Sequence, residues 1–373
     1  MVIISLLFCI LRCTSSYDVG VDYHAIGTNF TDTVFITQFH RPDIRFTVLK
    51  QLQGMVDQGA TFVSLRIWFV NEPGTTPDQT WRATFPITEQ ETANLHQYVQ
   101  DVASIQSTID GHRLHLDICL LWLGAADYTI GNPIDGLGYY RLNASDFTSR
   151  VQTTIESVVR AVSEVKRPDG VLLVQTIYLD GEVMIGAKAN QDWFLETNYP
   201  YFIKLVSNSQ FTPSIYFIVD GLEEHVLQYD YIDPQFPALN GHRSMYWIYR
   251  GLNFLKTHQL PLPSRIDFSC YIDRQNATYL NLTNHIFNDA SLSLSVLGVP
   301  DLYAVAETYY FVNATQRREY GQAFASEALV HTRLNRLSFW TTPDAGGKGI
   351  DVAYPFAIHD FLLPSFQNQI KKD

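Results

Sequence analysis

Short apolar runs and longer amphipathic stretches alternate along the chain from Tyr17 onward. Apolar, β-branched runs are typical of strands buried on both faces of a parallel sheet, whereas apolar residues three and four apart are typical of helices packed on such a sheet. The runs predict strands over Val19–Ile26, Thr61–Val70, Leu114–Leu123, Val171–Val183, Ser214–Asp220, Arg265–Ile272, Asp301–Tyr310 and Leu337–Thr342. Eight such units without a linker-like break predict a single (β/α)8 barrel of the α/β class.

The amphipathic stretches between these runs predict the helices. A helix over Pro42–Gln58 has Gly59 just past its end, and Thr88 with Glu91 forms a capping box for a helix that we expect to reach Ile109. Ser145 is a plausible cap for a helix with Val151, Ile155, Val158 and Val162 on one face. Further helices are predicted over Asp192–Ser207, Arg243–Thr257, Leu280–Leu292, Gln316–Arg336 and Pro355–Phe361.

Length and composition agree with this fold. A chain of 373 residues with 46% hydrophobic and 17% charged residues is globular and of ordinary size for a barrel with insertions. The main structural alternative is a doubly wound open sheet. No Gly-x-Gly-x-x-Gly turn follows the first predicted strand, which disfavours a dinucleotide-binding version of that sheet.

Charge and motif content exclude several function classes. The net charge is −12 and no long basic run is present, which argues against a nucleic-acid partner. The eleven histidines show no metal-binding spacing such as His-Glu-x-x-His. We therefore expect neither a metal nor another cofactor.

The amino-terminal segment has the features of a secretory signal. Residues Val2–Leu11 form a short apolar run followed by small residues, so we expect a signal peptide over residues 1–16 and a mature domain over 17–373. No other segment approaches the length of a membrane span. Five Asn-x-Ser/Thr sites agree with secretion to the extracellular space or the secretory-pathway lumen: Asn29, Asn143, Asn276, Asn281 and Asn313.

Cysteine usage adds little to this. Cys9 and Cys13 lie in the expected signal peptide, which leaves Cys119 and Cys270 in the mature chain. Both lie in apolar, strand-like runs on strands expected nearly opposite each other. Buried thiols are the favoured interpretation over a disulfide between them.

The chemistry of a (β/α)8 barrel collects at the carboxyl ends of its strands. Carboxylates and aromatic residues dominate those positions here: Arg66, Trp68, Asp117, Trp122, Tyr178, Asp180, Glu182, Asp220, Tyr271, Asp273, Glu307, Tyr309, Trp340 and Asp344. Sugars suit such a mixture, because carboxylates accept hydroxyl hydrogen bonds and aromatic faces pack on the C–H side of a sugar ring. The structural alternatives are a salt-bridged acid at the barrel mouth for Glu182 and for Glu307, an acid of a barrel layer for Asp117, and packing residues for Trp122 and Trp340.

These strand ends resemble those of the clan of retaining glycoside hydrolases built on (β/α)8 barrels, which includes cellulases, mannanases and β-glycosidases. In that clan the acid/base glutamate ends the fourth strand and the nucleophilic glutamate ends the seventh, and Glu182 and Glu307 occupy those positions. Arg66, Tyr271 and Trp340 also match residue types that the clan places around the nucleophile and the sugar. The resemblance implies an oligo- or polysaccharide substrate, with Trp68, Asp117, Trp122, Asp180 and Asp220 as further binding residues.

Two features depart from the clan's pattern. The clan usually has Asn directly before the acid/base glutamate, to bind the sugar 2-hydroxyl, and Gly181 stands there in this chain. The tripeptide Asn71-Glu72-Pro73 spells the clan's familiar motif but follows the second strand, where too few residues precede it for three complete βα units. We assign it to a surface loop.

Two other functions remain open. Chitinase-like enzymes that use the substrate's own N-acetyl group have Asp-x-Glu at the end of the fourth strand, as Asp180 and Glu182 do, but their two further aspartates are replaced here by Tyr178 and Gln175. The second is a secreted carbohydrate-binding pseudoenzyme on the same barrel, for which Gly181 is the main argument.

Overall fold

The computed structural model describes residues 18–23, 34–70, 83–84, 86–122, 144–180, 194–207, 211–220, 246–263, 265–271, 303–308 and 334–340. The expected signal peptide, the five Asn-x-Ser/Thr sites and the helices predicted over Leu280–Leu292 and Pro355–Phe361 lie outside these ranges.

Nine parallel strands form one sheet in the described part of the chain, and eight of them join in a ring. The strands are β1 (Asp18–Tyr23), β2 (Phe62–Val70), β3 (Ala83–Thr84), β4 (His115–Trp122), β5 (Val174–Asp180), β6 (Thr212–Asp220), β7 (Arg265–Tyr271), β8 (Tyr303–Thr308) and β9 (Leu334–Trp340). The order is β1-β9-β8-β7-β6-β5-β4-β2-β3, and β1 also pairs with β2. Since β1 is bonded to both β9 and β2, these pairings close the barrel, and β3 is an addition to β2. The predicted (β/α)8 barrel is confirmed.

Most predicted strand bounds match within a few residues, and the last strand shows the main difference. We expected a helix to continue through Arg336 and the strand to begin at Leu337, whereas β9 begins at Leu334. The prediction was wrong at this boundary, where Asn335 and Arg336 interrupt the apolar pattern of the strand. Arg336 is in fact buried within the barrel and paired with acids. The short strand β3 was not predicted.

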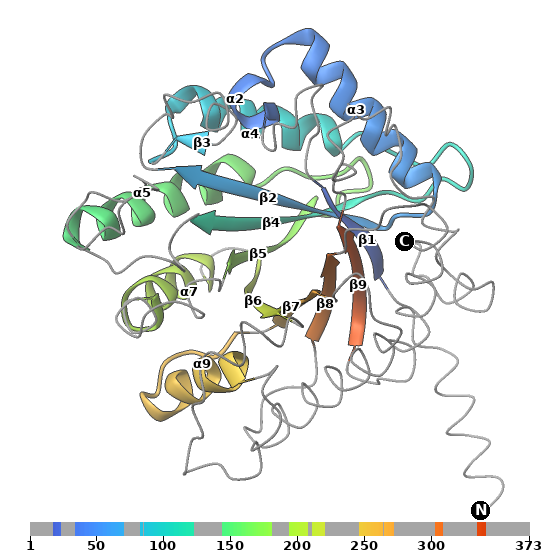
Figure 1. The fold of residues 1–373 in the computed structure, drawn as a ribbon. Helices are drawn as coiled ribbons and strands as arrows, with labels where there is room; N and C mark the ends of the chain where they lie inside the picture. The colour runs from blue at the N-terminus through green and yellow to red at the C-terminus, as the bar shows by residue number, and fades with distance from the viewer. Residues whose placement is uncertain are drawn as a thin grey trace, which may run out of the picture.

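Helices lie around the outside of the strands (Figure 1). They are α2 (Val34–Gln38), α3 (Pro42–Asp57), α4 (Glu89–Val102), α5 (Ala144–Val162), the π-helix η3 (Phe194–Asn198), α7 (Tyr199–Ser207) and α9 (Tyr246–Thr257). Neighbours in the chain pack against one another, α3 on α4, α4 on α5 and α5 on α7. The described helices therefore follow the alternation that the sequence predicts. None of them combines the length and the apolar character that a bilayer crossing requires.

The start of α4 agrees with the prediction, whereas its end does not. The Thr88–Glu91 capping box is present, but the helix stops at Val102 and Ile109 is 75% exposed instead of contributing to the apolar face. Polar groups redirect the chain here. The backbone N–H of Ser107 bonds to His112 O at 2.8 Å, and that of Thr108 bonds to Asp57 Oδ1 at 2.7 Å. These bonds satisfy donors that a continued helix would use.

Helix α5 has the apolar face that the sequence predicts. Val151, Ile155, Val158 and Val162 are all buried. Ser145 lies inside the helix, which begins at Ala144, so its prediction as the N-cap was wrong.

One close contact explains a glycine at the start of the barrel. Gly20 of β1 pairs with Phe62 of β2, and a Cβ atom on Gly20 would lie 2.4 Å from the Phe62 carbonyl oxygen. Arg336 lies over the Phe62 ring at 3.7 Å from its centroid. The amino-terminal end of the barrel is thus filled by an aromatic ring and a guanidinium group, and the position at Gly20 leaves no room for a side chain.

Candidate active site

The carboxyl ends of the strands gather the predicted site residues at one rim of the barrel. Strands β5, β6, β7 and β9 end at Asp180, Asp220, Tyr271 and Trp340. Glu307 is the penultimate residue of β8, which ends at Thr308. Since all strands of the ring are parallel, their last residues lie at the same end of the barrel.

Backbone pairing shows which rim positions are neighbours. Glu307 pairs with Cys270 of β7 and with Phe339 of β9, each the residue before a predicted site residue, Tyr271 or Trp340. Asp220 pairs in turn with Tyr271. The backbone positions of Glu307, Tyr271, Trp340 and Asp220 therefore form one continuous stretch of the rim over β6, β7, β8 and β9.

The strands that carry the two glutamates have the expected places in the ring. Counted along the chain without β3, β5 is the fourth ring strand and β8 is the seventh. Glu182 and Gly181 follow Asp180 directly and lie outside the described residues, as does Asn71-Glu72-Pro73. Arg66 is the middle residue of β2, Trp68 lies in the carboxyl-terminal half of that strand, and Trp122 is the last residue of β4.

Asp117 lies at the opposite end of the barrel from this rim. It is the third residue of β4 and is 1% exposed, with Oδ2 3.0 Å from Arg265 Nη2 and 2.6 Å from Arg336 Nη1. These partners come from β7 and β9, which are not adjacent to β4, so the carboxylate lies inside the barrel. We therefore correct its assignment to the substrate-binding group: it is the structural acid of a barrel layer that the sequence left as an alternative.

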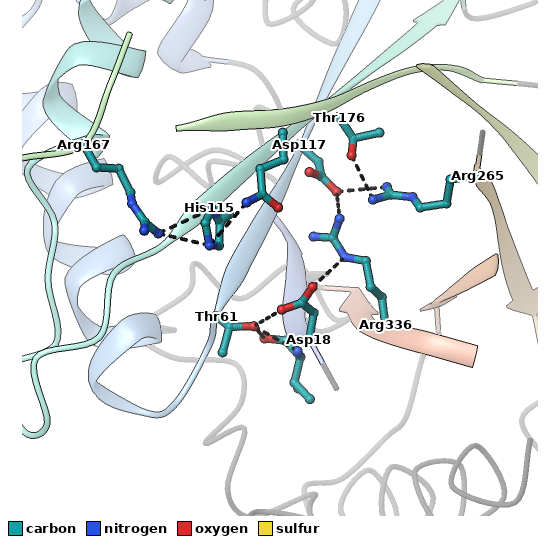
Figure 2. A network of polar contacts seen from close by, with 10 residues as sticks. Asp18, Thr61, His115, Asp117, Arg167, Thr176, Arg265 and Arg336 are labelled. Carbon is teal, nitrogen blue, oxygen red and sulfur yellow. Dashed lines mark hydrogen bonds and ion pairs between the residues drawn. The ribbon is translucent and has the colours of Figure 1, made fainter. Parts of the chain in front are cut away.

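A polar network surrounds Asp117 (Figure 2). Arg265 also donates to Thr176 Oγ1 at 2.9 Å, and the Nε atom of Arg336 is 3.9 Å from Asp18 Oδ2, an ion pair too long for a hydrogen bond. Arg265 and Arg336 were missed by sequence reasoning. A signal was present in the sequence, since each arginine lies near the start of an apolar strand. A cation buried at such a position requires an acid partner, so the sequence could have predicted an ion pair inside the barrel.

A second buried contact crosses the barrel wall beside Asp117, whose register partner in β2 is Ser64. The hydroxyl groups of Ser64 in β2 and Tyr178 in β5 share a hydrogen bond, across β4, which separates these strands in the ring. Tyr178 is 3% exposed, so this strand-end candidate is a residue of the barrel interior.

Cysteines and metal-binding groups were the other candidates for reactive chemistry. Cys119 is buried in β4 as a thiol, as predicted, while the side chain of Cys270 lies outside the described part. Within the described ranges, no group of three or more His, Cys, Asp and Glu side chains is arranged to hold a metal ion.

Comparison with known proteins identifies the fold. No protein-family model and no curated protein sequence matches the chain. Among solved structures, fungal β-1,4-galactanases align over 95% of this chain and 99% of theirs, with 12% identity and a TM-score of 0.51. The GH26 β-mannanase BoMan26A from Bacteroides ovatus aligns over 97% of this chain and 92% of its own, with 10% identity and a TM-score of 0.50.

A modular endo-β-1,4-mannanase from Cellulomonas fimi aligns over 83% of this chain, with 11% identity and a TM-score of 0.47, and the chain spans 65% of that protein. Identities this low establish the fold and not the reaction. The chain is a (β/α)8 barrel whose fold is similar to those of the fungal β-1,4-galactanase and the GH26 β-mannanase.

Proposed function

We propose that this protein is a secreted glycoside hydrolase that cleaves O-glycosidic bonds with retention, with Glu307 as nucleophile and Glu182 as acid/base. One observation carries the proposal. Glu307 lies at the carboxyl end of the seventh ring strand, while the fourth ring strand, β5, leads directly into Glu182. Retaining enzymes use two carboxyl groups about 5–5.5 Å apart on either side of the scissile bond.

The proposed chemistry assigns a role to each glutamate. The Glu307 carboxylate attacks the anomeric carbon while Glu182 donates its proton to the leaving oxygen, giving a glycosyl ester on Glu307 and a free alcohol. Glu182 then removes a proton from water, which attacks the same carbon and releases Glu307. The first step needs Glu182 protonated near neutral pH, which burial and nearby negative charge favour.

The remaining rim residues are proposed to bind the sugar. Acidic side chains at Asp180 and Asp220 suit hydroxyl groups, and the aromatic residues Trp68, Trp122 and Trp340 suit stacking on sugar rings. Arg66 and Tyr271 are proposed to hold Glu307 ionised through charge and hydrogen bonding. Because two structures that share this fold are named as a β-1,4-galactanase and a β-mannanase, β-1,4-linked hexose polysaccharides are the first substrates to test.

The direct experiment measures reducing-sugar release from galactan, mannan and β-glucan by the mature chain and by two variants. We expect turnover on at least one polymer, and losses of about 10³-fold or more in kcat for Glu307→Ala and Glu182→Gln, the scale set by removal of a group that acts in the transition state. Azide is expected to restore part of the Glu307→Ala activity with inversion. Retention of activity by both variants would overturn the assignment.

The Asp180-Gly181-Glu182 sequence favours one alternative, substrate-assisted hydrolysis of N-acetylated glycans. That mechanism uses no nucleophile on the seventh ring strand. Near-normal chitin hydrolysis by Glu307→Ala, with loss of activity in Asp180→Asn, would favour it over the two-glutamate mechanism.

The second alternative is a carbohydrate-binding pseudoenzyme. Gly181 stands where an asparagine that contacts the sugar 2-hydroxyl is expected, so that contact is missing. Affinity for a glycan with no hydrolysis by the wild-type chain, and unchanged affinity in Glu182→Gln, would favour that function. Secretion, cleavage of residues 1–16 and glycan attachment are part of our proposal, and mass spectrometry of the exported protein tests them.

A further inference from the structure

The carboxylate of Glu91 holds the short strand β3 at the rim of the barrel. Thr84 of β3 donates its backbone N–H to Glu91 Oε1 at 2.8 Å and its hydroxyl at 3.1 Å. The second oxygen, Oε2, accepts from the Thr88 backbone N–H at 2.9 Å and from the Thr88 hydroxyl at 2.8 Å. Glu91 is only 4% exposed, so four donors replace the water that its charge has lost.

A helix cap does not require this full set of contacts. The capping box uses Glu91 Oε2 and Thr88 alone, and the two bonds from Thr84 to Oε1 are additional. Glu91 therefore connects two elements, the first turn of α4 and the strand β3.

Strand β3 lies at the rim of the barrel, so the connection through Glu91 acts on the wall of the candidate active site. Within the described residues, strand β1 pairs with β2 as far as Leu65, and β2 continues to Val70. Beyond Leu65, β3 pairs with Phe69 and Val70, on the side of β2 away from β4. Figure 1 shows β3 beside the carboxyl end of β2. Since β1 is the other neighbour of β2, β3 extends the barrel wall above β1, at the rim that carries the candidate active site.

The connection from β3 to α4 is fixed on its outer side as well. Ala83 is fully buried and Ile87 is 7% exposed, and the Ile87 backbone N–H bonds to the buried Thr154 hydroxyl of α5 at 3.4 Å. Thr84 itself pairs with Val70 of β2 and bonds to the Glu91 carboxylate, which ties it to α4.

We infer that Glu91 is a positioning residue for substrate binding: it fixes β3 as part of the rim wall beside Phe69 and Val70 of β2 and thereby shapes the rim that receives the glycan chain. This inference rests on the proposed glycosidase function and extends it to a residue that does not touch the reacting atoms. Without the carboxylate, Thr84 loses its bonds to Glu91, and β3 is held by its pairing with β2 but no longer by α4.

The test compares Glu91→Gln with two controls in the mature chain. Glu89→Gln makes the same change of charge at an exposed residue of the same helical turn. Thr88→Ala removes the cap of α4 and the hydroxyl bond to Glu91 Oε2 but leaves the acceptor of the Thr84 bonds, Oε1, in place, so it reports the effect of a weaker cap. Steady-state kinetics on the hydrolysed polysaccharide and thermal unfolding are measured for all three.

We expect Glu91→Gln to raise KM about tenfold, the scale of losing one or two charge-assisted hydrogen bonds, while kcat changes by less than about threefold. Both controls are expected to keep the wild-type KM. Equal KM values for Glu91→Gln and Thr88→Ala at similar unfolding temperatures would overturn the inference.

An independent measurement separates this inference from the proposed activity. Limited trypsin digestion at the Arg82–Ala83 bond, followed by mass spectrometry of the new Ala83 terminus, reports release of β3. Faster cleavage in Glu91→Gln than in Thr88→Ala supports anchoring by Glu91, and equal rates overturn it, whether or not the chain hydrolyses a glycan. Absence of turnover by the wild-type chain would overturn the proposed function instead.

Discussion

The carboxylate of Asp117 accepts a hydrogen bond from Arg336 at 2.6 Å inside the barrel, from a strand that is not its neighbour. Arg265 reaches the same Oδ2 atom at 3.0 Å. One carboxylate thus joins β4, β7 and β9 at the amino-terminal end of the barrel. In (β/α)8 barrels this end determines stability, while the opposite end carries the reaction.

Replacing Asp117 with Ala is expected to destabilise the protein strongly, because two buried arginines lose their closest acid partner. The expected cost in the free energy of unfolding is about 3–5 kcal/mol. Urea unfolding followed by circular dichroism measures it.

Asp43→Ala is the matched control, since Asp43 pairs with Arg41 on the surface with side-chain exposures of 64% and 49%. It is expected to unfold close to the wild-type midpoint. Folded Asp117→Asn is expected to keep the wild-type KM. A large KM increase in a variant with an unchanged midpoint would return Asp117 to the sugar-binding group.

Because α4 ends before Ile109, we expect substitution of Ile109 to destabilise the protein much less than substitution of the buried Ile155. Ile109→Ala is expected to change the free energy of unfolding by less than about 0.5 kcal/mol, because the side chain is 75% exposed. Ile155→Ala, at a fully buried position of α5, is expected to cost about 2–5 kcal/mol. Denaturant titration of both variants measures the difference. Similar costs at the two positions would contradict this placement of Ile109.

Local signals in the sequence were enough to predict the ring of strands and several helix faces. The spacing of apolar residues and helix capping depend on residues close together in the sequence. The Thr88–Glu91 capping box and the buried face of α5 could therefore be predicted from the sequence. The end of α4 depended on Asp57, a residue from another element that accepts the Thr108 N–H. A contact between residues so far apart in the chain cannot be predicted from the local sequence around α4.

The site was predictable only in part, for the same reason. The order of strands places Asp180, Asp220, Tyr271 and Glu307 at one rim, and a count of βα units was enough to find it. The same count could not separate Asp117 from these residues, because its depth within β4 is set by Arg265 and Arg336 on distant strands. The role of β3 was missed because a two-residue strand has no period to detect.

Acid is expected to weaken the loop before β5 through Asp169. The hydrogen bond from the Arg167 guanidinium lowers the pKa of the Asp169 carboxyl below its ordinary value of 3.8. A carboxyl with a lower pKa in the folded state stabilises the protein above its unfolded pKa, and this contribution is lost as the pH falls through the folded value.

Asp169→Asn is therefore expected to lower stability at pH 6 and to reduce the loss of stability between about pH 4 and lower values. Thermal unfolding of wild type and variant across that range measures the effect. Parallel pH profiles for the two proteins would contradict a stabilising Arg167–Asp169 pair.

The central claim is covalent catalysis by Glu307, and the most direct measurement is peptide mapping after trapping. The chain is incubated with a 2-deoxy-2-fluoro glycoside of the sugar it hydrolyses, digested at low pH and analysed by tandem mass spectrometry. We predict one fluorosugar per chain, ester-linked to Glu307. A label on another residue, or hydrolysis with inverted product and no label, would contradict the account.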